Sequence, residues 1–138
     1  MTLAFYIKLY LVTLAAFFVI DLAWLGLVAR SFYSKYLGYL MRPSPNWTAA
    51  IIFYLIFILG LVVFVLVPGL QSGALGRTLL VAAFFGLVTY ATYDLTNLAT
   101  VRDWPLLITI VDLAWGMVLS TSVTAVAFLI GRAMLGNG

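Results

Sequence analysis

Aspartates inside apolar segments are the residues of this sequence best suited to chemistry. The chain of 138 residues has only four acidic residues, and three of them, Asp21, Asp94 and Asp112, lie within long apolar runs. A carboxylate at the centre of a membrane helix costs about 2.5–3.5 kcal/mol on insertion scales, so three cost roughly 7–10 kcal/mol together. Hydrogen bonding between helices, the other role of such residues, returns about 0.6–2 kcal/mol per bond. Three aspartates at one depth, with Tyr, Thr and Asn on the same helical faces and no basic residue inside to neutralise them, favour a functional polar pocket.

The flanking basic residues give the depth of the three aspartates. Asp21 precedes Arg30 by nine residues. Asp94 precedes Arg102 by eight residues, and Asp112 follows it by ten. At 1.5 Å per residue, these spacings place all three roughly 12–15 Å from one membrane face, near the bilayer midplane. We therefore expect three carboxylates in one layer.

Further polar and aromatic side chains share helical faces with these aspartates or flank them. Carboxylates crowded in a low-dielectric layer cannot all ionise, so at least one is expected to exchange protons near neutral pH. The expected ligand or proton site consists of Asp21, Asp94, Asp112, Trp24, Tyr90, Tyr93, Thr96, Asn97 and Trp115. The expected rim at the membrane surface consists of Arg30, Arg102, Asp103 and Trp104.

The tetrapeptide Asp-Leu-Ala-Trp occurs twice, at residues 21–24 and 112–115. The two copies lie on helices predicted to run in opposite directions. From a common aspartate layer, Trp24 and Trp115 are therefore expected to project toward opposite sides.

The absence of His and Cys from the sequence narrows the possible chemistry. It removes disulfides, thiolate nucleophiles, Cys/His zinc sites and His-based acid–base catalysis. The sequence also contains no phosphate-binding Gly-rich loop, nucleophile elbow or metal motif. We expect no cofactor and no metal. The net charge of +3 fits a membrane surface and gives no case for nucleic acid as a partner.

The composition determines which elements hold the aspartates. Hydrophobic residues make up 66% of the chain and charged residues 8%, against roughly 45–50% and about 25% in soluble domains. The apolar excess must face a lipid bilayer, whose core of about 30 Å needs about 20 apolar residues per helix. Four helices of that length are predicted, at about 3–29, 47–68, 78–101 and 105–131. The prediction is an all-α, integral membrane four-helix bundle that forms a single domain over residues 1–138.

Charges, Pro and Gly define the expected helix ends. The first helix is expected to end at Arg30, and the second at Pro68 and Gly69, because Pro and Gly together break a helix. The second helix has only Tyr54 as a polar group between its ends. It is therefore expected to be a brace that faces lipid.

The connections between the helices differ in character. Residues 30–46 mix basic and aromatic residues and read as a short interfacial segment lying on the membrane. The turn at residues 102–104 is so short that the third and fourth helices must be antiparallel neighbours. These two connections carry four basic residues, against three on the other side of the membrane. The difference favours their location in the cytoplasm.

Several motifs together resemble domain-of-unknown-function family 2177, a family of small bacterial membrane proteins. They are residues 90–100 (Tyr-Ala-Thr-Tyr-Asp-Leu-Thr-Asn-Leu-Ala-Thr), 103–105 (Asp-Trp-Pro), 112–116 (Asp-Leu-Ala-Trp-Gly), 21–26 (Asp-Leu-Ala-Trp-Leu-Gly), 32–33 (Phe-Tyr) and 37–38 (Leu-Gly). The resemblance covers nearly the whole chain. It implies a multi-pass, four-helix protein of the bacterial inner membrane and assigns no catalytic role to any residue.

Three functions fit these observations. The first is an intramembrane pocket that binds or transports a small molecule or lipid headgroup with proton coupling, in a protein that dimerises. The second is a non-catalytic subunit or scaffold whose aspartates pair with a partner's intramembrane cation. The third is a membrane-embedded enzyme that uses Asp and Tyr as acid and base on a lipid or isoprenoid, with Arg30 and Arg102 holding an anionic headgroup.

Overall fold

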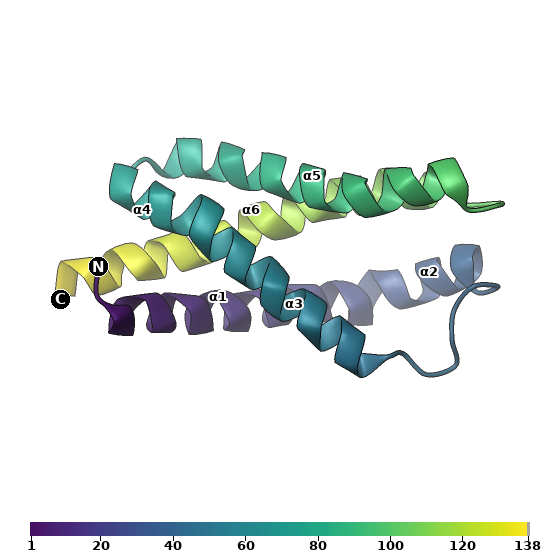
Figure 1. The fold of residues 1–138 in the computed structure, drawn as a ribbon, viewed down its shortest axis with the longest axis horizontal. Coiled ribbons are helices and arrows are strands. Elements are labelled where there is room, and N and C mark those ends of the chain that lie inside the picture. The colour runs from purple at the N-terminus through teal and green to yellow at the C-terminus, as the bar shows by residue number, and fades with distance from the viewer. Residues whose placement is uncertain (138) are drawn as a thin grey trace.

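A computed structural model describes residues 1–137, which are all helical apart from short connections (Figure 1). The elements are α1 (Leu3–Trp24), η1 (Leu25–Ala29), α2 (Arg30–Leu37), α3 (Trp47–Leu61), η2 (Val62–Leu66), α4 (Val67–Ser72), α5 (Leu75–Thr100) and α6 (Leu106–Asn137). They join into four continuous helices that are long and apolar enough to cross a membrane, over Leu3–Leu37, Trp47–Ser72, Leu75–Thr100 and Leu106–Gly136. The fold is a four-helix membrane bundle, with both termini at its left end in Figure 1.

The first helix continues past the expected end at Ala29. The elements α1, η1 and α2 follow one another without a break, and η1 is a single π-helical turn in which the Arg30 amide donates to the Leu25 carbonyl. A charge ends an apolar span, but it does not end a helix when no Pro or Gly-rich break follows. Only residues 38–46 therefore form the irregular connection to α3.

The second helix also continues where a break was expected. It runs through Pro68 and Gly69 to Ser72 and ends at Gly73, which adopts the left-handed conformation with φ 75°. The π turn η2 lies directly before Pro68, and the Val67 amide donates to the Val62 carbonyl there. A widened turn makes room for a Pro ring that would clash with a regular α-helical turn. The prediction of a helix end at Pro68 was wrong for this reason.

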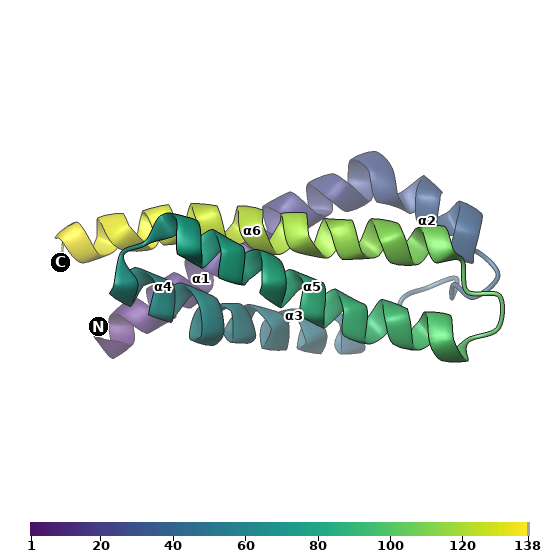
Figure 2. The same cartoon turned by 90° about the horizontal axis from the view of Figure 1, so that it is seen from above.

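The third and fourth helices, α5 and α6, are antiparallel and pack along each other (Figure 2). Gly86 and Gly116 let them approach closely. A Cβ at Gly86 would overlap the Gly116 carbonyl, and a Cβ at Gly116 would overlap the ring of Tyr90. Such small-residue contacts are typical of helix pairs in membranes.

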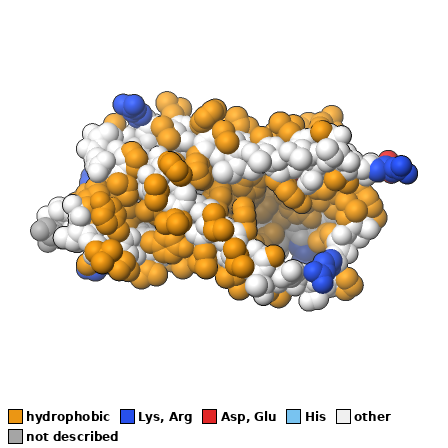
Figure 3. Space-filling view, viewed as in Figure 1, with side chains coloured by type: hydrophobic (Ala, Val, Ile, Leu, Met, Phe, Trp, Pro, Cys, Tyr) orange, Lys and Arg blue, Asp and Glu red, His pale blue; other side chains and the backbone are white. Residues whose placement is uncertain are grey.

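The core of the bundle lies in the half nearer the termini. Its buried side chains come from all four helices: Phe5, Leu9, Phe17, Phe57, Ile58, Leu61, Val62, Val65, Leu66, Leu70, Ala82, Leu119, Val123, Ala127 and Phe128. The face shown in Figure 3 is largely apolar, and the basic side chains visible on it lie mainly toward the two ends of the molecule. An apolar belt with charged ends is the surface that a bilayer requires.

Candidate functional site

A cavity of about 620 Å³ occupies the other half of the bundle, nearer the connections at 38–46 and 101–105. Figure 3 shows a hollow in this half, between α3 and α5. Residues from every membrane helix line the cavity: Asp21, Trp24, Leu25, Tyr33, Ala49, Ala50, Phe53, Tyr54, Thr89, Tyr90, Tyr93, Asp94, Asp112 and Trp115. Among the described residues, the lining contains no Lys or Arg.

Asp21, Asp94 and Asp112 all line this cavity and are buried. Asp94 of α5 and Asp112 of α6 lie within hydrogen-bonding reach of each other. Both carboxyl oxygens of Asp94 are buried without a hydrogen-bond donor among residues 1–137. An unpaired polar group loses its hydration without compensation, so the burial of Asp94 is costly when it is ionised.

Tyr33 of α2 donates its hydroxyl hydrogen to Oδ1 of Asp112. The sequence analysis placed Tyr33 in the interfacial segment and not in the site. In a regular α-helix, the twelve residues from Asp21 to Tyr33 would separate them by about 120° around the axis. The π turn η1 absorbs one extra residue and reduces the separation to about 20°. The local widening of the helix thus brings Tyr33 to the cavity face.

The two indoles of the repeated tetrapeptide stack in the cavity wall. Trp24 and Trp115 have ring centroids 4.4 Å apart and an interplanar angle of 11°. The expectation that they project toward opposite sides was wrong. Side chains lean toward the N-terminus of their own helix, so on antiparallel helices these two rings lean toward each other. Asp21 lies beside the Trp115 indole.

Aromatic rings close the cavity toward the dry core. Phe57 of α3 contacts Phe85 and Tyr90 of α5, at centroid distances of 5.5 and 6.3 Å. It also contacts Phe17 of α1 at 5.6 Å, and Phe17 contacts Tyr54 at 5.3 Å. This cluster joins α1, α3 and α5 where the cavity ends. Access from the terminal end of the bundle is therefore blocked by packed rings.

The second helix exposes much of its surface, as expected of a lipid-facing brace, and it also forms part of the cavity wall. Ala49, Ala50, Phe53 and Tyr54 of α3 line the cavity, and the later residues of the same helix belong to the core. Counting polar groups did not reveal this second role. An apolar helix can form the wall of a pocket without contributing any polar group.

Two of the predicted site residues lie away from the cavity. Thr96 is exposed and Asn97 is half-buried on α5, about one turn beyond Asp94, and neither belongs to the lining. The other predicted site residues all line the cavity: Asp21, Asp94, Asp112, Trp24, Tyr90, Tyr93 and Trp115. Besides Tyr33, sequence reasoning missed Thr89 of α5 and Leu25 of η1, together with the four α3 residues.

The predicted rim residues lie at the open end of the bundle but do not line the cavity. Trp104 packs edge-on against Tyr93, with centroids 6.0 Å apart, and donates its indole hydrogen to Thr109. Asp103 adopts a left-handed conformation with φ 59°, and its carbonyl accepts the Tyr39 hydroxyl hydrogen. The rim therefore ties the turn at 101–105 to the connection at 38–46.

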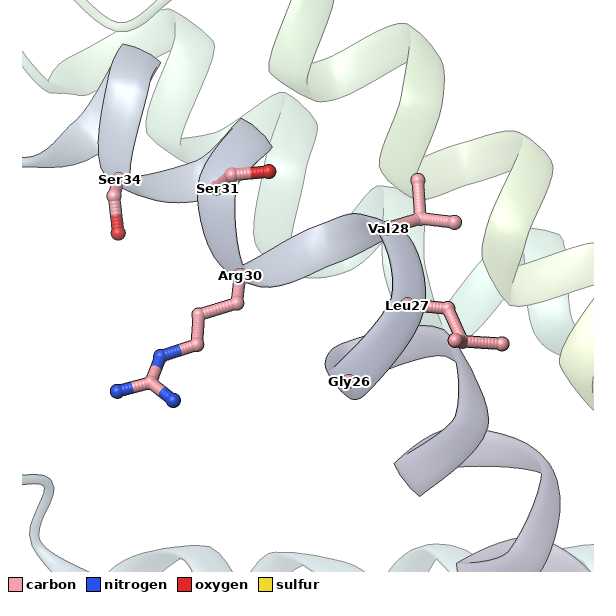
Figure 4. A pocket seen from close by; sticks show the side chains of 6 residues that line it. All are labelled: Gly26, Leu27, Val28, Arg30, Ser31 and Ser34. Atoms are coloured by element: carbon pink, nitrogen blue, oxygen red, sulfur yellow. The ribbon is translucent and has the colours of Figure 1, made fainter.

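Arg30 lies at a separate surface recess of about 430 Å³. The lining comes entirely from η1 and α2: Gly26, Leu27, Val28, Arg30, Ser31 and Ser34. Figure 4 shows the Arg30 side chain extending away from the helix, while Leu27 and Val28 point elsewhere. Arg30 and Arg102 are both exposed.

Asp94 and Asp112 form a pair in the cavity wall, and Asp21 lies apart from them. Within residues 1–137, no three carboxylates converge closely enough to hold a metal ion. The arrangement suits a ligand large enough to contact several walls at once.

One family profile, described as predicted membrane protein (DUF2177), matches residues 6–129. The chain belongs to the DUF2177 family. No curated protein and no solved structure shows significant similarity to it. Membership in this family, together with four apolar helices, makes this DUF2177 chain a multi-pass membrane protein in contact with the lipid bilayer.

Proposed function

We propose that this DUF2177 protein binds a small molecule or lipid headgroup inside the membrane and couples its binding or transport to protons. We place it in the bacterial inner membrane, with the connections at 38–46 and 101–105 in the cytoplasm. One observation carries the proposal: a cavity of about 620 Å³ lined by three buried carboxylates. Cavities of this volume lie within the range of small-molecule sites.

Proton coupling is supported by the pairing of Asp94 and Asp112. Two carboxyl groups at hydrogen-bonding range in a poorly hydrated site repel each other when both are charged, so the pair tends to hold one proton. Titratable groups face this pair from each packed helix: Asp21 of α1, Tyr33 of α2, Tyr54 of α3, and Tyr90 and Tyr93 of α5. A ligand that alters the charge of the pair alters its proton occupancy, and this linkage is reciprocal.

The burial of the aspartates supports a ligand inside the chain over a partner helix outside it. Asp21, Asp94 and Asp112 expose 9%, 0% and 8% of their surface. An intramembrane cation on a partner would need carboxylates on the outer face of the bundle. This geometry favours the binding hypothesis over the scaffold hypothesis.

Native mass spectrometry of the purified protein tests the proposal. We expect a bound small molecule or lipid on the wild type, with an occupancy that changes with pH. The isosteric variants Asp94→Asn and Asp112→Asn should lower the occupancy by about tenfold. Asp103→Asn, which changes an exposed acid outside the cavity, should leave it unchanged. Identical spectra for the wild type and the folded cavity variants would contradict the proposal.

A further inference from the structure

The charge of the cavity wall indicates the class of ligand. Three carboxylates contribute to the lining and, in the part of the chain that the structure describes, no basic side chain opposes them. Asp94 is fully buried, and neither of its oxygens receives a hydrogen bond from residues 1–137. An ionised carboxylate in such a place needs a counter-charge. A cationic ligand supplies this counter-charge, whereas a phosphate or carboxylate group would be repelled.

The remaining wall of the cavity is aromatic. The stacked pair Trp24 and Trp115 lies beside Phe53, Tyr54 and Tyr90 in the lining. Aromatic faces attract cations through their quadrupole, and sites for substituted ammonium groups combine such rings. Because the carboxylates do not converge on one point, the wall suits an organic cation with an apolar body better than a metal ion.

The opening of the cavity indicates the route of entry. The hollow in Figure 3 faces sideways between α3 and α5, while packed rings around Phe57 close the opposite end. Phe53 and Tyr93, which line the cavity from these two helices, are 50% and 62% exposed. Their neighbours Ile52, Ile56 and Leu95 are also exposed and apolar. This surface faces lipid, so a molecule can enter from within the bilayer.

We propose that the cavity binds an organic cation with an apolar body, whose positively charged group lies at Asp94 and Asp112 and whose body packs against the Trp24 and Trp115 stack. The inference rests on the proposed function, because it names the ligand class of the same site. The cation and the proton compete for the same carboxylates, so binding of one releases the other.

Two probes of matched shape and opposite charge test the inference on the purified full-length protein. Equilibrium dialysis in nanodiscs measures the binding of tetraphenylphosphonium and tetraphenylborate, with empty nanodiscs as the background. Above that background, we expect the wild type to bind the cation at least about tenfold more tightly than the anion. Equal affinity, or preference for the anion, would overturn the inference without needing any variant.

Variants then test whether tetraphenylphosphonium binds in the cavity. Asp94→Asn should weaken tetraphenylphosphonium binding by about tenfold or more, and Asp112→Asn provides a second route if the first variant misfolds. The matched control Asp103→Asn should bind like the wild type. Wild-type affinity in both folded cavity variants would overturn the assignment.

Competition distinguishes a free cation from a membrane-borne one. Tetramethylammonium in water and hexadecyltrimethylammonium in the nanodisc carry the same charged group, and displacement of tetraphenylphosphonium by either supports an organic cation. Displacement by the short ion indicates a water-borne ligand, and displacement by the long-chain ion alone indicates one that arrives through the lipid. Displacement by neither overturns the inference.

The two proposals fail in different ways. A neutral or anionic molecule bound to the wild type in native mass spectra, and lost in the Asp94→Asn variant, would refute the cation and leave the proposed function standing. A cavity that binds nothing in an aspartate-dependent manner would refute both.

Discussion

At the scale of single residues, the carboxyl groups of the site differ in the hydrogen bonds that they receive. Asp112 accepts the Tyr33 hydroxyl hydrogen, whereas Asp94 beside it has no hydrogen-bond donor among residues 1–137. A proton shared with Asp112 or a group from outside the protein would complete such an acceptor. The asymmetry separates Asp112, which the protein holds by a hydrogen bond, from Asp94, which has no donor.

Tyr33→Phe tests the hydrogen bond to Asp112. Removing the donor leaves a buried carboxyl group less satisfied, so we expect a loss of stability of about 1–3 kcal/mol. Thermal unfolding in detergent, followed by circular dichroism, measures the loss. Tyr39→Phe is the matched control, because it removes an exposed hydrogen bond to the Asp103 carbonyl and should cost less. Equal midpoints for the Tyr33→Phe variant and the wild type would show that the bond contributes nothing.

Residue types and helical spacing predicted most of the acidic and aromatic lining. Carboxylates are conspicuous in apolar helices, and a helical period assigns them to faces. Tyr33 could not be found in this way, because its place on the cavity face requires a π turn that the spacing does not reveal. The Trp24 and Trp115 stack was missed for another reason. The position of each residue along its helix predicts opposite sides, but each side chain also leans toward the N-terminus of its own helix, which brings the two rings together.

At the scale of elements, the two π turns η1 and η2 have different structural effects. In the second helix, η2 precedes Pro68 and lets the helix continue to Ser72. In the first helix, no Pro follows η1 before α2 ends, so a Pro ring does not explain this π turn. Its effect is to rotate α2 relative to α1, which sets Tyr33 on the same face as Asp21. Such insertions occur frequently at functional sites.

Deleting Gly26 tests the role of η1. With one residue fewer, η1 can become regular α-helix, and the eleven residues that then lead from Asp21 to Tyr33 leave them about 20° apart, as the π turn does. We expect the deletion to keep Tyr33 on the cavity face, so a further Tyr33→Phe change should cost as much as it does in the wild type. Gly26→Ala keeps the chain length, and its added Cβ meets no atom within 4 Å, so it should behave like the wild type. A deletion variant in which Tyr33→Phe has no effect would contradict this role.

At the scale of the whole molecule, the bundle has a closed half and an open half. The apolar core and the aromatic cluster around Phe57 fill the half that carries the termini. The cavity occupies the half that carries the two loops, and it opens between α3 and α5. Composition and span length predicted four membrane helices. They could not predict this difference, because it depends on α3 diverging from α5.

Cysteine labelling tests the proposed orientation. The chain has no Cys, so Ser44→Cys and Gln71→Cys each introduce a single thiol at an exposed position on opposite sides of the membrane. Four basic residues against three favour a cytoplasmic location for residues 38–46. A membrane-impermeant maleimide should therefore label Gln71→Cys in intact cells and Ser44→Cys only after permeabilisation. The reverse pattern would invert the orientation.

The length of the first helix has a consequence for where the cavity sits in the bilayer. The helix spans 35 residues, about 52 Å at 1.5 Å per residue, while the hydrocarbon core is about 30 Å thick. The helix must therefore tilt or extend past the core. Asp21 and Tyr33 lie about 18 Å apart along it, so with Asp21 near the midplane Tyr33 reaches the headgroups. The cavity thus extends from the apolar centre of the bilayer to its hydrated boundary, so its two ends differ steeply in polarity.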